Sequence, residues 1–345
     1  MKKLYALLPI LAALLVPGKA SAQMMPDSTV QIVAYWEVGD QITYRAETKT
    51  YDVDAEGNET QASASSELMH FKVVDATDST YTLEVTYEVL SDPDLERFIS
   101  PEEMNAHFNT PYRFKTDELG SFLRLENLDE VAEVAQGLRP YFKKAVLKEL
   151  DAIPGKDEIA SETLEKLVDG TVDAAMLSLS PEVLESAFVT EVSPLLFYHG
   201  CKLDTTATYS YTQNLAGILD GVDAEAEGVF WVDSGYTDEE KVLIISELEA
   251  GTEQLGPVIQ QYLGPMISAI AGSFEGMSEE ECQAAIAEMF ENATLEISQS
   301  SGELIHLATG WPITVSSDSY VLCKIMDQEA NRHVEKTIHY YAPEQ

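Results

Sequence analysis

Near the C-terminal end of the sequence, histidine and carboxylate side chains recur at spacings that could bind a metal ion. His333, Glu335 and His339 would share one face of a strand, because alternate side chains of a strand point the same way. Imidazole and carboxylate together are a plausible set of metal ligands. However, His333 and His339 would lie about 20 Å apart along a strand, and the opposite face carries the apolar Val334 and Ile338. We therefore interpret this face as the solvent-exposed side of a strand and predict no metal site.

Oxygen-bearing side chains also gather where the chain is expected to turn. Asp52, Asp54 and Glu56, followed by Gly57, resemble the start of a calcium loop, which requires glycine at its sixth position and glutamate at its twelfth. Counted from Asp52, the twelfth residue is Ser63. Because the closing ligand is missing and strand-like segments flank this stretch, the pattern favours a hairpin turn.

A histidine and a cysteine could form a catalytic pair just after an apolar helix end. His199 and Cys201 flank Gly200 there, but a helix stop with a small buried thiol explains them as well as a catalytic dyad does. Neither G-x-S-x-G nor H-E-x-x-H occurs in the chain. With 60 acidic residues, spacing alone selects no carboxylate pair for glycoside hydrolysis. The sequence therefore favours a protein without catalytic residues or a cofactor, with a hydrolase as the least favoured alternative.

Residues 255–274, LGPVIQQYLGPMISAIAGSF, combine apolar side chains at helical spacing with two Gly-Pro pairs. Proline removes a backbone hydrogen bond and kinks a helix. One interpretation is a kinked core helix, and the other is a mobile apolar flap over a ligand cavity. The second interpretation supplies the candidate ligand-binding residues, which are Val258, Tyr262, Met266 and Ile270.

The first 22 residues have the pattern of a secretory signal peptide. Two lysines precede an apolar run over 4–16, and the small residues Ala20, Ser21 and Ala22 follow it. The run is shorter than the roughly 20 apolar residues that a spanning helix needs. We therefore expect a periplasmic or secreted protein whose mature chain begins near Gln23 and contains no transmembrane segment.

The charge of the chain is strongly negative. Its 60 acidic and 21 basic residues give a formal net charge of −39. Removal of residues 1–22, which hold three lysines and no acid, would leave −42. Such a surface repels phosphate backbones and anionic headgroups, so the composition disfavours nucleic-acid partners and favours a basic protein partner or a highly solvated surface.

Three cysteines, Cys201, Cys282 and Cys323, would lie in an oxidising compartment after export. They permit one disulfide with three pairings, and one thiol would be left over.

The order of elements along the chain indicates an α+β fold. Apolar and polar residues alternate over 41–46 and 80–90, which is typical of antiparallel strands with one buried face. Further strands are expected at 68–74, 112–114, 122–125, 208–214, 225–232, 241–249, 294–298, 303–307, 313–326 and 333–341, and helices at 128–198 and 254–291. Between 112–125 and the first helix, Asn127 and Glu130 match a capping box.

A sheet of this size curls or closes. We predict a large curved antiparallel sheet of about 9–11 strands, with two helical insertions packed on its concave face. Residues 23–345 would form a single domain, or alternatively two β-then-α halves, 23–200 and 201–345.

Short stretches of the sequence also resemble known proteins. The run Trp36-Glu37-Val38-Gly39-Asp40 ahead of a strand with Tyr44 is similar to a pattern in uncharacterised secreted proteins of Gram-negative bacteria, as are Thr116-Asp117 and Gly120 before Asn127. The expected curled sheet around helices also resembles the lipoprotein-carrier (LolA-like) half-barrel. This resemblance implies an envelope protein that holds an apolar group in its concavity, and it supplies no catalytic residues.

These patterns support one leading hypothesis, a soluble envelope protein that binds an apolar small molecule or a lipid without catalysis. The alternative is an acidic protein–protein interaction module of the cell envelope.

Overall fold

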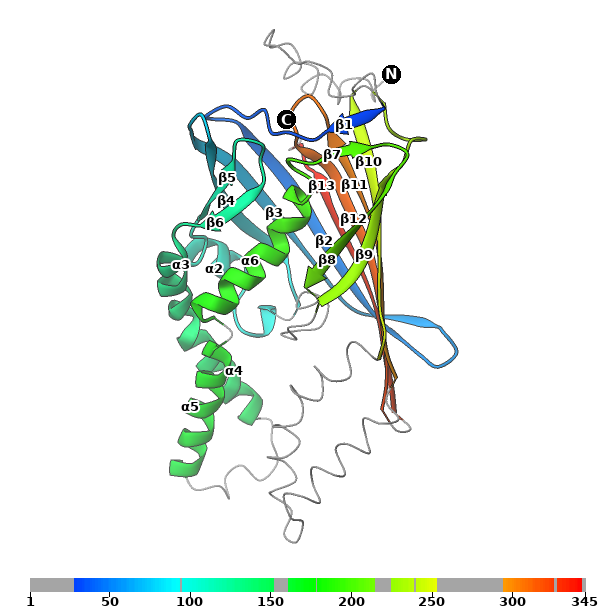
Figure 1. Cartoon of the computed structure of the whole chain (residues 1–345). Coiled ribbons are helices and arrows are strands. Elements are labelled where there is room, and N and C mark those ends of the chain that lie inside the picture. Colours follow the sequence, from blue (N-terminus) through cyan, green and yellow to red (C-terminus); the bar gives the residue numbers. More distant parts are fainter. Residues whose placement is uncertain are drawn as a thin grey trace, which may run out of the picture.

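A computed structural model describes residues 28–93, 95–151, 161–177, 179–214, 225–238, 240–252, 294–325 and 328–342 of the chain. Eleven strands of this part form one antiparallel sheet (Figure 1). In spatial order they are β6 (Phe122–Leu125), β5 (Tyr112–Asp117), β4 (Thr80–Ser91), β3 (Glu59–Ala76), β2 (Gln41–Val53), β13 (Gln328–Tyr340), β12 (Pro312–Ile325), β11 (Thr294–His306), β10 (Lys241–Ala250), β9 (Glu225–Val232) and β8 (Thr208–Asn214). The predicted fold class, a large curved antiparallel sheet with helical insertions, is confirmed.

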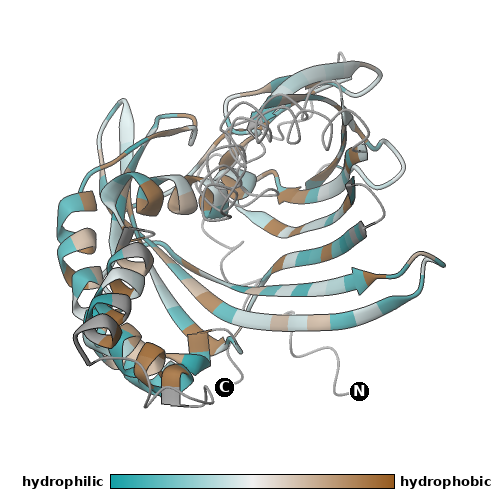
Figure 2. Ribbon diagram, turned by 90° about the horizontal axis from the view of Figure 1, so that it is seen from below, coloured by the Kyte–Doolittle hydropathy of each residue, from teal (hydrophilic) through white to brown (hydrophobic). Residues whose placement is uncertain are grey.

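Strand alternation determines which face of the sheet is buried. In β2, Tyr44 and Ala46 are buried, whereas their odd-numbered neighbours point to the other face. Strands β2, β3 and β4 form a meander, since each strand pairs with the next along the chain. Figure 2 shows the sheet bending around the helices, which makes the face of Tyr44 and Ala46 the inner, concave one. On the outer face, β2 carries mostly polar side chains, such as those of Thr43, Arg45 and Lys49.

The hairpin between β2 and β3 has the geometry predicted from its sequence. The carboxylate of Asp54 accepts hydrogen bonds from the backbone of Glu56 and Asn58, and Gly57 has a φ of +82°. Asp54 therefore closes an Asx-type turn, in which its oxygens are already used by the loop itself.

The end of the chain forms three long strands where four had been predicted. Residues 294–298 and 303–307 belong to one strand, β11, and the intervening Ser300, Ser301 and Gly302 keep their pairing with β10 and β12. The expected separation into two strands is wrong, because ladder hydrogen bonds on both sides keep these three residues extended.

The described helices are α2 (Pro101–His107), α3 (Leu128–Ala135), α4 (Arg139–Asp151), α5 (Ser161–Leu177) and α6 (Pro181–Leu196). Gly170 lies inside α5, although glycine is a poor helix former. The predicted capping box at α3 is wrong. The Asn127 side chain bonds backbone groups of Arg113 and Pro111 at the start of β5, so it is not free to cap the helix.

The N-terminal segment 29–36 crosses one end of the sheet, and we call it the strap (Figure 1). Its strand β1 (Thr29–Gln31) pairs with β7 (Lys202–Asp204). Beyond β1, Ile32 donates to the carbonyl of Cys201 and Ala34 donates to that of Leu119. Trp36 then stacks on Trp311 with ring centroids 4.3 Å apart. The strap thus ties together three loops that are distant in sequence.

Helix α6 covers the concave face. Its buried Phe188, Val192, Leu195 and Leu196 belong to one core cluster with inward side chains of the central strands. The helix begins at a residue pair typical of helix starts, because Ser180 accepts a hydrogen bond from the backbone of Val183 and proline follows it. Among the described helices, none combines the length and the apolar composition that crossing a bilayer requires.

Candidate functional site: cavities beside helix α6

Two cavities flank α6 on the concave face of the sheet. The larger, which we call the α2 cavity, has a volume of about 310 Å³ and lies between α6, α2, β3 and β4. Its lining residues are Glu67, Tyr87, Val89, Met104, Asn105, Phe108, Asn109, Thr110, Tyr112, Ala187, Phe188 and Glu191.

The second, which we call the α6 cavity, has a volume of about 270 Å³ and lies between α6 and strands β8, β10, β11, β12 and β13. Its lining residues are Val189, Thr190, Ser193, Pro194, Phe197, Tyr198, Tyr211, Thr212, Gln213, Ser246, Gln299, Ser301, Glu303, Val315, Ser317, Lys336 and Ile338.

An ion pair stands between the two cavities. Lys336 on β13 donates to Glu191 on α6 over 2.8 Å between Nζ and Oε2. Glu191 lines the α2 cavity and Lys336 lines the α6 cavity. Both side chains are about three-quarters buried, so this pair is screened less than a surface pair is.

The α2 cavity contains a carboxyl group with a strongly raised pKa. Burial, followed by the nearby charge of Glu191, raises the pKa of Glu67 to about 7, although the cation of Lys336 acts in the opposite direction. Burial also raises the pKa of the Tyr87 hydroxyl well above its usual value. Near neutral pH, Glu67 therefore titrates inside the protein.

The α6 cavity contains a carboxyl group that is more deeply buried. Glu303 is 4% exposed, and burial raises its pKa well above the usual range. Its Oε1 has no hydrogen-bond partner among the described residues, and the same is true of Oε1 of Gln299. Nearby, the hydroxyls of Ser246 and Ser301 bond to each other at 2.6 Å. Burial thus favours the protonated form of Glu303, whose carboxyl group lines the cavity and can form hydrogen bonds there.

This cavity has an apolar side and a polar side. Aliphatic and aromatic groups come from α6 and its C-terminal end, including Val189, Pro194 and Phe197, and from Tyr211 on β8. The hydroxyl, amide and carboxyl groups come mainly from β10, β11 and β12. Such a lining suits a small molecule that has an apolar body and a hydrogen-bonding end.

The candidate residues that the sequence supplied lie elsewhere. Val258, Tyr262, Met266 and Ile270 belong to 253–293, outside the described residues, so their assignment to a ligand site stays a prediction.

His199 is buried beside the strap, where its ring lies 5.6 Å from that of Trp36. Burial lowers the pKa of His199 to about 4 and raises that of the Cys201 thiol. Within the described residues, Cys201 and Cys323 pack in different clusters and form no disulfide with each other.

Sequence reasoning missed Glu67 and Glu303, although a signal for both was present. Glu67 has the same parity as the buried Met69 and Phe71 of β3, and Glu303 has that of the buried Ile305 in β11. A carboxyl group at an inward position of an alternating strand points into the protein, which distinguishes these two from the many surface acids.

Comparison with known proteins assigns no family. No protein-family model and no curated protein matches the chain. A structure titled "Lipid-protein interactions in lipovitellin" is similar with 11% identity and a TM-score of 0.41, over 89% of this chain and 25% of that one. The chain thus spans about a quarter of the lipovitellin chain.

Two structures of bacterial proteins are less similar. A loop-deletion mutant of OmpT from Vibrio cholerae has 7% identity and a TM-score of 0.20, over 88% of this chain and 100% of that one. The attachment invasion locus protein Ail of Yersinia pestis has 4% identity and a TM-score of 0.14, over 88% and 100%. With TM-scores below 0.5, none of these likenesses bears on the function of this chain. The resemblance to the lipoprotein-carrier half-barrel stays a prediction.

Proposed function

We propose that this chain is an exported envelope protein that binds a small amphipathic molecule in the α6 cavity without transforming it. The observation that carries this proposal is Glu303, a buried carboxyl group whose Oε1 has no described hydrogen-bond partner and which lines a cavity of about 270 Å³. That volume is close to the lower end of ligand pockets, about 300 Å³. Leaving a buried polar group unpaired costs free energy, and a ligand that bonds to it recovers that cost.

The chemistry of the lining defines the ligand class. In its protonated form, the Glu303 carboxyl group can both donate and accept a hydrogen bond, so it suits a hydroxyl or amide end. The aromatic and aliphatic wall from α6 suits a compact apolar body. We propose binding rather than catalysis because the described lining residues include neither a histidine nor a cysteine that could activate a nucleophile.

Dye binding tests this proposal. N-phenyl-1-naphthylamine has an apolar body and one N–H donor, and its fluorescence rises in an apolar site. We expect it to bind the purified chain and Ser317→Trp to abolish that binding, because Ser317 lines the α6 cavity. Ser316→Trp is the matched control, since this neighbour on β12 is exposed on the outer face.

Equal dye binding by both tryptophan variants would contradict the proposal. Thermal unfolding of the two variants should be compared first, so that a folding defect in Ser317→Trp is not mistaken for a filled cavity. As a second measurement, native mass spectrometry of gently purified protein should show a co-purified molecule that Ser317→Trp lacks.

A further inference from the structure

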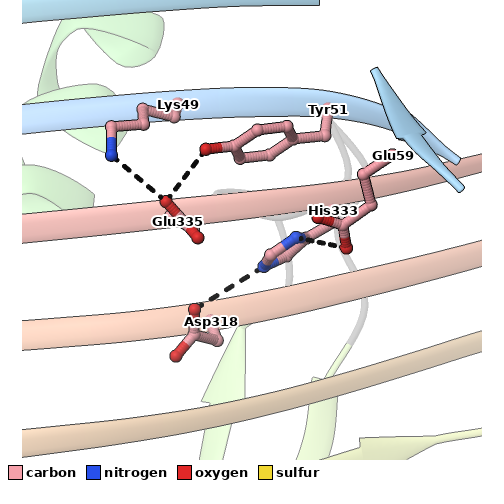
Figure 3. A network of polar contacts seen from close by, with 6 residues as sticks. All are labelled: Lys49, Tyr51, Glu59, Asp318, His333 and Glu335. Atoms are coloured by element: carbon pink, nitrogen blue, oxygen red, sulfur yellow. Dashed lines mark hydrogen bonds and ion pairs between the residues drawn. The ribbon is translucent and has the colours of Figure 1, made fainter. Parts of the chain in front are cut away.

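On the outer face of the sheet, opposite the α6 cavity, a histidine lies buried among carboxylates (Figure 3). His333 on β13 is 4% exposed. Its Nδ1 lies 3.0 Å from Oε1 of Glu59, at the start of β3. Since a carboxylate only accepts, Nδ1 carries the proton of this hydrogen bond.

Two tyrosines fix the orientation of this imidazole ring. The ring of Tyr320 stacks on it with centroids 4.1 Å apart and an interplanar angle of 5°. Tyr51 stacks with centroids 5.3 Å apart and an angle of 20°. His333 is therefore held in one plane between β2 and β12, with little freedom to rotate.

The other ring nitrogen is directed at acidic groups without a hydrogen bond. Nε2 of His333 is buried and has no hydrogen-bond partner among the described residues, and Oδ1 of Asp318 is 3.6 Å away. Nε2 is therefore a buried nitrogen without a hydrogen bond that faces this carboxylate. A buried polar atom without a partner costs free energy, and a metal ion placed between the ring and the carboxylate would be bound by both.

A second carboxylate completes the group. Glu335 is next but one to His333 along β13 and pairs across the strands with Asp318. One ligand atom from each of the three side chains lies within 4.8 Å of the others. Glu335 is oriented by the hydroxyl of Tyr51 at 3.1 Å and by Nζ of Lys49 at 3.4 Å (Figure 3).

We propose that Asp318, His333 and Glu335 bind one divalent transition-metal ion of the zinc type. One imidazole and two carboxylates are ligands that such ions accept, and three protein ligands leave a position open for water. The hydrogen bond from Nδ1 to Glu59 is the usual outer support of a metal-binding histidine.

Ion binding requires only side-chain rotation. Asp318 and Glu335 are 55% and 39% exposed, so their carboxylates can close on an ion at about 2.0–2.2 Å. Lys49 opposes a cation, but Glu59, Asp318 and Glu335 outnumber it. The site lies on the face opposite the α6 cavity and does not depend on the proposed ligand there.

The sequence predicts no metal site because His333, Glu335 and His339 of one strand lie too far apart to bind one ion. The described group instead takes Asp318 from the neighbouring strand β12 and leaves His339 out. The spacing argument against His339 is therefore compatible with this proposal.

Zinc binding tests the proposal directly. The full chain, purified without a histidine tag and stripped with a chelator, should take up one zinc ion in equilibrium dialysis against zinc chloride. Asp318→Asn and Glu335→Gln should each weaken binding at least about tenfold, and Glu59→Gln about 10- to 100-fold, as losses of ligands and of an outer partner do. His339→Gln, on the same strand and face, should leave binding unchanged.

Two outcomes would overturn the proposal. The first is loss of zinc by His339→Gln that equals the loss by Asp318→Asn. The second comes from ¹H–¹⁵N spectra of the imidazole side chains near neutral pH, if His333 is protonated on both nitrogens and zinc does not shift its Nε2. Asp318→Asn changes an exposed side chain, so this variant tests the site even if replacement of the buried His333 disrupts folding.

Discussion

At the scale of single residues, Glu303 costs the protein stability where it lies. It occupies an inward position of β11, and its Oε1 has no partner among the described residues. A buried, unsatisfied polar atom typically costs about 1–3 kcal/mol. Since an apolar side chain of the same size would avoid this cost, the proposed binding role gives a reason for the carboxyl group.

Glu303→Met should therefore raise the free energy of unfolding by about 1–2 kcal/mol, because methionine has a similar shape without the unsatisfied oxygen. Urea denaturation at neutral pH measures the change. Glu296→Met, at an exposed position of the same strand, is the control and should stay within about 0.5 kcal/mol of the parent chain. If Glu303→Met were instead less stable than the parent chain, the carboxyl group of Glu303 would have to be hydrogen-bonded in the protein in solution.

At the scale of elements, the strap packs against turns that only glycine fits. Gly120 has a φ of +100°, and a Cβ built there would lie 2.5 Å from Cδ2 of His199 and 2.8 Å from Cβ of Ala34. Gly57 has a comparable φ of +82°, but no atom of the described residues lies within 4 Å of such a Cβ. Both glycines have a positive φ, but only Gly120 is also closely packed, so comparing them separates the cost of the backbone conformation from the cost of a steric clash.

Gly57→Ala should lower the free energy of unfolding by about 1 kcal/mol, the cost of a left-handed backbone at a residue with a Cβ. Gly120→Ala should cost about 2 kcal/mol more, because the added methyl group must also displace the strap or His199. Chemical denaturation of the two variants gives both values. Equal losses would show that the contact between the strap and this turn is looser than described.

Local sequence patterns predicted most elements but not their ends or side-chain partners. Alternation identified β2 and β4, and Ser180 with Pro181 marked the start of α6. The pattern was wrong for β11, which was expected as two separate strands, because pairing on both sides keeps Ser300, Ser301 and Gly302 extended. It was wrong for Asn127 because its side chain bonds a distant strand end.

At the scale of the whole molecule, long-range pairing could not be predicted from the sequence. Early strand β2 pairs with late strand β13, which brings Tyr51 opposite His333. Periodicity shows which residues of a strand share a face, but not which residues of two strands pair. It therefore predicts neither Tyr51 nor Asp318 as a neighbour of His333. Glu67 and Glu303 could have been predicted as inward acids, whereas the cavities that they line depend on where α6 packs.

Two buried groups give the whole molecule opposing responses to pH. Glu67 has a folded pKa of about 7, above its ordinary value of 4.5, so the folded state binds more protons and stability falls as pH rises through this range. His199 has a folded pKa of about 4, below its ordinary value of 6.5, so stability falls as pH decreases through that range. At about 1.4 kcal/mol per pKa unit, each effect is roughly 3 kcal/mol, and between pH 4.5 and 6.5 they oppose each other.

Glu67→Gln should remove the loss of stability that Glu67 causes as the pH rises. The variant should gain stability relative to the parent chain as pH rises from 4.5 to 7, by roughly 2–3 kcal/mol over the range, since only the parent must ionise a buried carboxyl group. Urea denaturation at several pH values gives both curves. Glu249→Gln, at an exposed position on β10, should run parallel to the parent. Parallel curves for Glu67→Gln as well would place this side chain in solvent.

The pairing of β2 with β13 also determines the order in which the molecule can be assembled. Lys49 and Glu335, which face each other across this seam, are 286 residues apart. One edge of β2 pairs with β3, but the other edge has no partner until β13, the last described strand, has been synthesised. Such an open edge can template aggregation. Closure of so long a loop makes this seam a late and slow folding step, so the nascent chain needs protection at β2 for nearly the whole of its synthesis.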